Sequence, residues 1–305
     1  MTGLNAQRSS ISTMHALNPY QNIQAFGGFD RSLSSTLMYR SQWAPIASNP
    51  RYLHFNAHLP VYFLNGGAGI IIEQEDLGLE SNSTAKISYN FVYRGNFGIL
   101  STGISAGLTQ KRLFQNDIIT PNGEYGPTIN HNDPILSNGT RAGVKTTYGI
   151  SALWQYNKLT AGIQIDDFFA PAITIDGVNY DGRSVVSLMA DYQYPLTEEL
   201  TLRPSALMVT NLNLWQFHLS MICNYGNIFG GMNLRGLSQN TIESVGIITG
   251  IKFNKHYTIA YSYDLGISSL KNSSEGSHEL ILKYNLNKII NTGLPPRIIY
   301  NPRDL

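Results

Sequence analysis

The sequence predicts an all-β protein, an antiparallel transmembrane β-barrel of about 14 strands. First, strand-length segments alternate apolar and polar residues: in 258–264, Ile259, Tyr261 and Tyr263 share one face. Second, short turns alternate along the chain with longer links, as in outer-membrane barrels. Third, only 13% of the 305 residues are charged, against roughly 25% in soluble domains. No stretch reaches the ~20 apolar residues of a membrane helix, so we expect strands to cross the membrane.

Composition excludes several other classes of protein. The net charge of +1 gives no electrostatic footprint for nucleic acid. The single cysteine, Cys223, excludes an intramolecular disulfide and a cysteine-based zinc site. His54 and His58 share a strand face but lie about 13 Å apart, too far for one metal ion. We therefore expect no metal, no cofactor and no catalytic residue.

The chain opens with segments that carry no strand pattern. Leu4-Asn5-Ala6 is similar to the end of a signal peptide, so residues 1–6 are interpreted as its remainder, with an ordinary N-terminus as the alternative. Residues 7–32 contain Asn18-Pro19 and no sustained period. We expect them to form an arm, either folded into the lumen or lying beneath it on the periplasmic side.

The barrel is expected over residues 33–285. Reading by period predicts these strands: 33–40, 52–60, 66–74, 84–94, 97–112, 145–156, 159–169, 184–195, 199–209, 213–223, 226–235, 241–253, 256–265 and 277–285. Their even number is typical of bacterial barrels.

The connections alternate in length. The short ones are predicted at Arg94-Gly95-Asn96, Tyr156-Asn157-Lys158, Pro195-Leu196-Thr197, Asn224-Tyr225 and Asn254-Lys255; the long ones are 41–51, 75–83, 113–144, 170–183 and 266–276. Short turns are periplasmic in such barrels, which predicts an outer membrane of a Gram-negative bacterium with both termini periplasmic. Residues 286–305 hold three prolines, which prevent a further strand, so we expect an extended periplasmic tail.

Three local patterns favour structural over chemical interpretations. Gly103-Ile104-Ser105-Ala106-Gly107 matches the G-x-S-x-G motif, but it continues as a strand where a nucleophile needs a strand-to-helix turn. Asp117, Glu124 and Asp133 lack the spacing of a calcium loop. Charged strand residues deep in the bilayer should point inward and pair across the lumen; the candidates are Glu73, Arg94, Asp166, Arg203, Arg235, Lys252, Asp264 and Lys283.

Several segments resemble the PorP/SprF family of outer-membrane proteins, over essentially the whole chain. The first predicted strand ends in Tyr39-Arg40-Ser41-Gln42-Trp43, close to the family's Tyr-Arg-x-Gln-Trp, and the last pair of strands carries Asp264 and Gly276-Ser277-His278-Glu279. Asn18-Pro19 is similar to the family's opening, although the residues after Pro19 depart from it. We expect architectural roles for these residues, with Arg40 in a lumenal ion pair and Trp43 as an interfacial anchor.

The resemblance implies a non-enzymatic barrel of type IX secretion or gliding. It implies binding of large adhesin-type cargo with a type B C-terminal signal, contact with periplasmic components of the machinery, and outer-membrane lipid around the wall. The alternative is a passive porin or a hydrophobic-solute transporter. Partner contacts are expected in the long loops and the tail, with these candidates: Asn122, Tyr125, His131, Asp133, Arg297 and Arg303.

Overall fold

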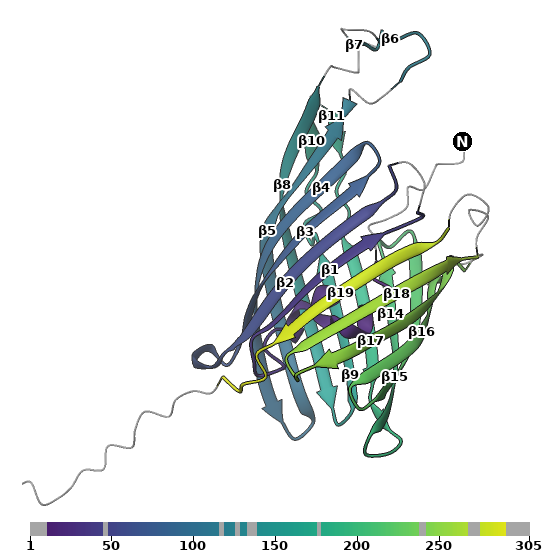
Figure 1. Ribbon diagram of the computed structural model, residues 1–305. Helices are drawn as coiled ribbons and strands as arrows, with labels where there is room; N and C mark the ends of the chain where they lie inside the picture. Colours follow the sequence, from purple (N-terminus) through teal and green to yellow (C-terminus); the bar gives the residue numbers. More distant parts are fainter. Residues whose placement is uncertain are drawn as a thin grey trace, which may run out of the picture.

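The computed structural model describes residues 11–44, 48–115, 119–125, 129–132, 139–175, 178–237, 242–267 and 275–290. In this part of the chain a closed antiparallel barrel of 14 strands is formed (Figure 1). Its strands are β1 (Ser34–Ser41), β2 (Arg51–Val61), β3 (Gly66–Leu77), β4 (Glu80–Gly95), β5 (Gly98–Phe114), β8 (Thr140–Tyr156), β9 (Leu159–Asp166), β12 (Val185–Tyr192), β14 (Leu200–Thr210), β15 (Trp215–Tyr225), β16 (Ile228–Leu237), β17 (Ser244–Phe253), β18 (Tyr257–Gly266) and β19 (Ser277–Asn285).

Each of the 14 strands pairs with the next barrel strand along the chain, and one further pairing, between the first and last strands, closes the ring. β1 pairs with β19, and β12 pairs with β14, which also pairs with the two-residue β13 (Tyr194–Pro195). Two small hairpins stand at the long-loop end (Figure 1): β6 (Glu124–Tyr125) with β7 (Ile129–Asn130), and β10 (Ile173–Ile175) with β11 (Val178–Tyr180).

The predicted barrel is confirmed, and one predicted link is wrong. Instead of a long link over 75–83, β3 runs to Leu77 and β4 starts at Glu80, so Gly78-Leu79 form a tight turn. Gly78 has φ +64°, which suits glycine in such a turn. The apolar–polar alternation did not predict these strand ends, because Gln74, Asp76 and Ser83 place polar side chains on the outer face. The hydrogen-bonded pairing of β3 with β4 nevertheless continues there. That is expected where a wall rises beyond the lipid.

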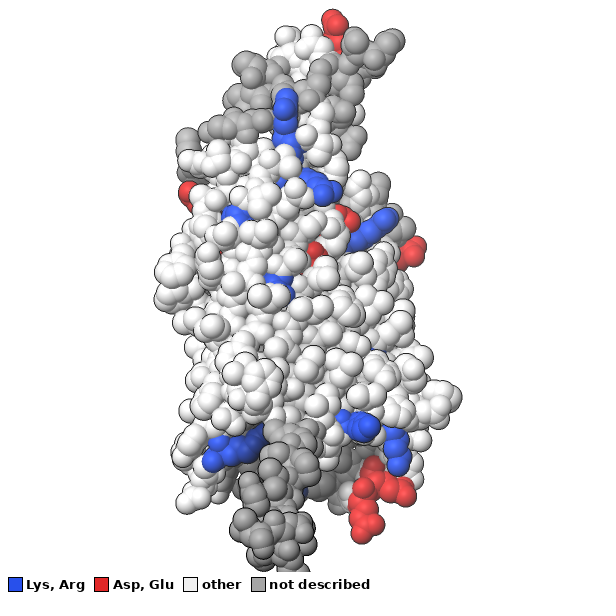
Figure 2. Space-filling model, turned by 90° about the vertical axis from the view of Figure 1, so that its left-hand side faces the viewer, with Lys and Arg blue, Asp and Glu red and all other residues white. Residues whose placement is uncertain are grey.

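The outer face carries an apolar band with aromatic side chains near its ends. Exposed aromatic residues gather at the short-turn end: Tyr93, Phe97, Trp154, Tyr156, Tyr192, Tyr194, Tyr225 and Tyr257. Tyr39, Phe168 and Phe169 are exposed towards the long-loop end. On the side of β4, β5 and β8, Lys, Arg, Asp and Glu show mainly in the upper part and at the lower end, with a nearly charge-free zone between them (Figure 2). This distribution is typical of a barrel wall in a bilayer.

The N-terminal arm lies inside the barrel (Figure 1). Its described part starts at Ile11, towards the long-loop end, and the chain leaves the lumen at the short-turn end, where β1 begins. Its elements are the short helices η1 (His15–Leu17), α1 (Pro19–Asn22) and η2 (Gln24–Phe26); a further one, η3 (Tyr62–Leu64), follows β2. No helix in the described residues is long and apolar enough to span a membrane.

Two apolar clusters fix the arm to opposite parts of the wall. Met14 and Ala16 pack in a cluster with residues of β1, β2 and β15–β19, including Met38 and Ile281. Ile23 and Ala25 pack in another with residues of β8, β12 and β14: Leu153, Met189, Leu207 and Val209. An arm with buried apolar side chains on both sides occupies the middle of the lumen as a packed plug.

The closest approach of the arm to the wall depends on glycine. A Cβ at Gly67 of β3 would lie 2.3 Å from the carbonyl oxygen of Gly27 and 2.9 Å from the nitrogen of Gly28. No other side chain fits against that backbone. Gly67 therefore lets the arm run directly against β3.

Candidate functional site

The first part of the site is a buried ion cluster on the inner wall. Arg40 near the end of β1 places Nη2 2.6 Å from Asp264 Oδ2 of β18 and Nη1 2.9 Å from Glu279 Oε2 of β19. All three side chains are about 1% exposed or less. A buried guanidinium balanced by two carboxylates on neighbouring strands satisfies the requirement that buried charges be paired. The expected ion pair of Arg40 is present, and it is shared between two carboxylates.

The arm completes this cluster. The Thr13 N–H donates to Glu279 Oε2 at 2.9 Å, and the Thr13 hydroxyl donates to Asp264 Oδ2 at 2.7 Å while accepting from Arg40 Nη1 at 2.9 Å. The Ser12 hydroxyl donates to Glu279 Oε1. We call Ser12, Thr13, Arg40, Asp264 and Glu279 the arm lock, because these bonds hold the arm to the strand pair that closes the barrel.

The motif Tyr39–Trp43 and the motif Gly276–Glu279 also meet at the rim of the barrel. Gln42 Nε2 donates to Glu243 Oε1 at 3.1 Å, and burial raises the pKa of Glu243 against the opposing effect of Arg40. The Trp43 N–H donates to Ser277 Oγ at 3.1 Å. The next N–H, of Ala44, donates to the carbonyl of Gly276, whose φ of +105° requires glycine.

Other motif residues lie outside the arm lock. Tyr39 and His278 point away from the lumen, and His278 Nδ1 lies 2.6 Å from the hydroxyl of Tyr261. Asn18 is buried in the arm and accepts a hydrogen bond from Asn56 of β2 at 3.0 Å; Pro19 follows it as the first residue of α1.

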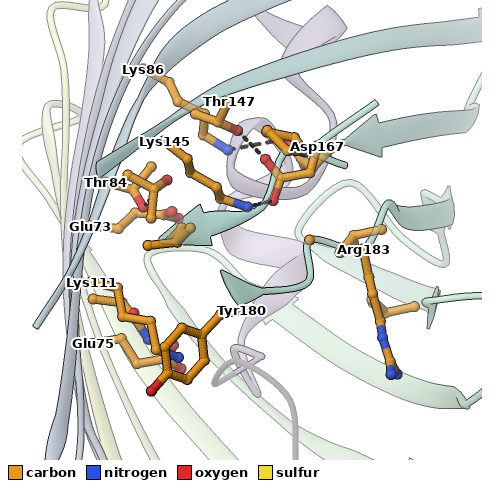
Figure 3. A pocket seen from close by; sticks show the side chains of 18 of the residues that line it. Glu73, Glu75, Thr84, Lys86, Lys111, Lys145, Thr147, Asp167, Tyr180 and Arg183 are labelled. Atoms are coloured by element: carbon orange, nitrogen blue, oxygen red, sulfur yellow. Dashed lines mark hydrogen bonds and ion pairs between the residues drawn. The ribbon is translucent and has the colours of Figure 1, made fainter. Parts of the chain in front are cut away.

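The second part of the site is a polar cavity of about 410 Å³ at the long-loop end (Figure 3). We call it the vestibule. Its lining comes from β2–β5, β8, β9, β12 and β14 and from the link between β9 and β12, which includes the β10–β11 hairpin. The arm supplies the rest of the lining. The hairpin sits directly on β8, because Gly143 leaves room there for Ile173 and Ile175.

Ion pairs line the vestibule. Lys145 Nζ lies 2.6 Å from Asp167 Oδ2, and the Thr147 hydroxyl donates to the other oxygen of the same carboxylate. Lys86 Nζ lies 3.1 Å from Asp166 Oδ1. Lys111 Nζ lies 2.6 Å from Glu80 Oε1 and 5.1 Å from the centre of the Tyr180 ring. Figure 3 shows Lys86, Lys145 and Asp167 converging on one side and Lys111, Glu75 and Tyr180 on another.

Among the described residues, the predicted inward charges that form ion pairs meet partners on the adjacent strand or up to three strands away around the wall. Asp264 lies in the arm lock, Asp166 pairs with Lys86, and Arg203 Nε lies 2.7 Å from Asp191 Oδ2 of the adjacent β12. Glu73 accepts from the Tyr52 hydroxyl at 2.6 Å. Arg94 and Lys252 are exposed near the short-turn ends of their strands. Arg235 Nη1 lies 3.7 Å from Asp264 Oδ2, so two of the predicted inward charges meet each other.

The proposed partner residues are placed only in part. Asn122 is exposed in the loop before β6, whereas His131 is buried and has an interaction partner. Tyr125 lies in β6. Asp133, Arg297 and Arg303 lie outside the described residues, as do residues 1–6.

Sequence reasoning missed Ser12, Thr13 and most of the vestibule. The hydroxyls of the arm gave no periodic signal. Lys86, Lys111 and Lys145 each lie at an inward position of their alternating strand, so continued alternation would have placed them in the lumen. The approach of the β10–β11 hairpin to β8 had no signal in the sequence beyond Gly143.

Solved structures and a protein family are similar to this chain. The outer membrane protein Omp33 of Acinetobacter baumannii is similar with a TM-score of 0.48 and 7% identity, covering 84% of this chain and 99% of that one. A FadL homologue of Pseudomonas aeruginosa is similar with a TM-score of 0.42 and 10% identity, covering 83% and 89%. No curated protein matches the chain. The family described as type IX secretion system membrane protein PorP/SprF matches residues 5–284. The chain therefore belongs to the PorP/SprF family and is an outer-membrane barrel of type IX secretion.

Proposed function

We propose that this barrel is a non-enzymatic binding component of type IX secretion or gliding, which anchors large adhesin-type cargo with a type B C-terminal signal at the cell surface. The observation that carries the proposal is the packed arm. Met14, Ala16, Ile23 and Ala25 are at most 2% exposed within the lumen. A lumen filled in this way suits a scaffold that binds proteins at its ends.

The same observation disfavours the alternative, a passive porin or hydrophobic-solute transporter. A transporter needs a continuous path, and the arm is held against the wall by two apolar clusters and the arm lock. Conductance in planar bilayers tests this choice. The intact protein should give no stable open level, and porin-like conductance would favour the alternative.

The orientation follows from the length of the connections. Short turns are periplasmic in outer-membrane barrels, so the ends of the barrel at Ser34 and Asn285 would face the periplasm. The vestibule and the links 115–139 and 167–184 would face outward. Loops on a rigid scaffold are where binding residues concentrate, so we assign cargo attachment to this end.

Deletion of the longest link tests the assignment. Because β5 ends at Phe114 and β8 starts at Thr140, residues 116–138 can be replaced by a short Gly-Ser linker without shortening a strand. We expect the barrel to assemble and surface cargo to be lost. A matched replacement of 211–213, between β14 and β15, should leave cargo in place. Intact display after removal of 116–138 would place attachment in the lumen or on the periplasmic side.

A further inference from the structure

The vestibule has a charge pattern that the arm lock and the loops do not explain. We infer that it binds a short extended peptide segment bearing Lys or Arg side chains, an inference that rests on the proposed role in cargo binding. Its volume of about 410 Å³ is within the range of cavities that hold small ligands. Few of its lining residues are apolar, which disfavours a lipid tail.

Carboxylates outnumber cations around the cavity. Among the described lining residues the carboxylates are Glu73, Glu75, Glu80, Asp166, Asp167 and Asp181, and the cations are Lys86, Lys111, Lys145 and Arg183. In Figure 3 the Arg183 side chain points away from the ion pairs around Asp167. A guest with positive charge complements this negative excess.

The cavity already shows how it holds an ammonium group. Lys111 Nζ lies 2.6 Å from Glu80 Oε1, as an ion pair, and 5.1 Å from the centre of the Tyr180 ring. A carboxylate and an aromatic face together stabilise a cation better than either alone. The nearby Glu75 belongs to the same wall, so a guest Lys or Arg meets the same kind of surface.

The arm supplies groups suited to a peptide backbone. Gln21 and Asn22 of α1 line the cavity, and two of their buried atoms, Gln21 Oε1 and Asn22 Nδ2, have no hydrogen-bond partner in the described structure. One atom accepts and the other donates. A peptide group offers the matching N–H and C=O, and buried polar atoms are normally satisfied.

The test uses the full-length barrel in detergent micelles and titration calorimetry with three probes. These are the amidated peptides Gly-Lys-Gly-Lys-Gly and Gly-Glu-Gly-Glu-Gly, and maltotriose. We expect the lysine peptide to bind about tenfold or more tightly than the glutamate peptide, as expected for charge-assisted bonds. Equal binding of the two peptides, tighter binding of maltotriose, or binding by no probe would overturn the inference.

Variants locate the binding. E75Q and D181N should each weaken lysine-peptide binding by roughly threefold to tenfold, as expected from the loss of one charged partner. D76N is the matched control, because Asp76 follows Glu75 on the opposite face of β3 and accepts from Gln74 Nε2 at 2.9 Å. Asp181 lies outside the strands, so D181N still tests the inference if E75Q folds poorly. Affinities unchanged in D181N and in folded E75Q contradict the inference.

The inference and the proposed function fail separately. If no peptide binds while deletion of 116–138 still abolishes cargo display, the vestibule inference is wrong and the cargo proposal stands. If the lysine peptide binds and cargo display survives the deletion, the vestibule site stands and the loop assignment fails.

Discussion

Arg40 and Glu279 are direct cross-strand partners in the pairing of β1 with β19, and their 2.9 Å ion pair lies where the barrel closes. Both side chains also bind Thr13 of the arm. One buried cluster therefore joins the arm, the first strand and the last strands. Closure of the barrel and docking of the arm should depend on the same charge balance.

Replacing Arg40 with Ala should reduce the amount of folded barrel. The change leaves Asp264 and Glu279 buried without their cation, a loss that costs about 3–5 kcal/mol in comparable pairs. Heat-modifiable migration and the urea midpoint of unfolding measure the effect. R112A is the control: it removes an exposed arginine whose guanidinium donates to Gln110 Oε1, and should cost less than about 0.5 kcal/mol. Adding E279Q to R40A should recover part of the loss. Normal folding of R40A with lost cargo display would instead make Arg40 a contact for a partner.

Replacing Gly67 with Val should displace the arm while the barrel stays closed. A side chain there meets the backbone of Gly27 and Gly28, whereas β3 keeps its pairing with β2 and β4. We expect faster proteolysis within residues 11–30 and the appearance of conductance. G230A is the control, since a Cβ there has its nearest neighbour at 3.5 Å, an ordinary contact. If the G67V barrel gives no conductance and resists protease, the arm tolerates the added side chain at residue 67.

The barrel could be predicted from the sequence because strand alternation is a local property. Ile259, Tyr261 and Tyr263 face outward on β18 wherever the rest of the chain lies. The motif Tyr39–Trp43 and the pair His278–Glu279 were found through the resemblance, and the structure brings Arg40, Asp264 and Glu279 into one cluster.

The arm and the vestibule could not be predicted in the same way. The fit of the arm depends on contacts between residues far apart in the chain, such as Thr13 with Asp264, which leave no period in the sequence. The upper wall was missed for another reason. Beyond the lipid, polar residues such as Gln74 occupy the outer face, so the apolar pattern stops before the strand does.

Arginine on the outer face should locate the edge of the bilayer. Ile104 on β5 is 64% exposed and Val144 on β8 is 56% exposed. Val144 pairs with Gln110 of β5, so it lies nearer the long-loop end than Ile104. I104R should destabilise the barrel in lipid by about 2–4 kcal/mol, and V144R by about 0–1 kcal/mol. Urea unfolding in vesicles measures both. Equal costs would mean that lipid reaches the top of the wall.

The last prediction concerns the periplasmic end. The described arm is buried in the lumen, so a link to periplasmic machinery would depend on the tail 286–305, where Arg297 and Arg303 offer charge. The Leu286 N–H donates to Leu33 and the Ile290 N–H donates to Arg31, at 2.9 and 3.0 Å, so these residues belong to the barrel end. A chain ending at Ile290 should therefore assemble normally and show heat-modifiable migration. We expect it to recover less of the periplasmic type IX components on co-purification. The full-length R297A/R303A variant isolates the contribution of charge and should show a smaller loss. Unchanged recovery after truncation would move the contact to the short turns, and failed assembly would give the tail a structural role.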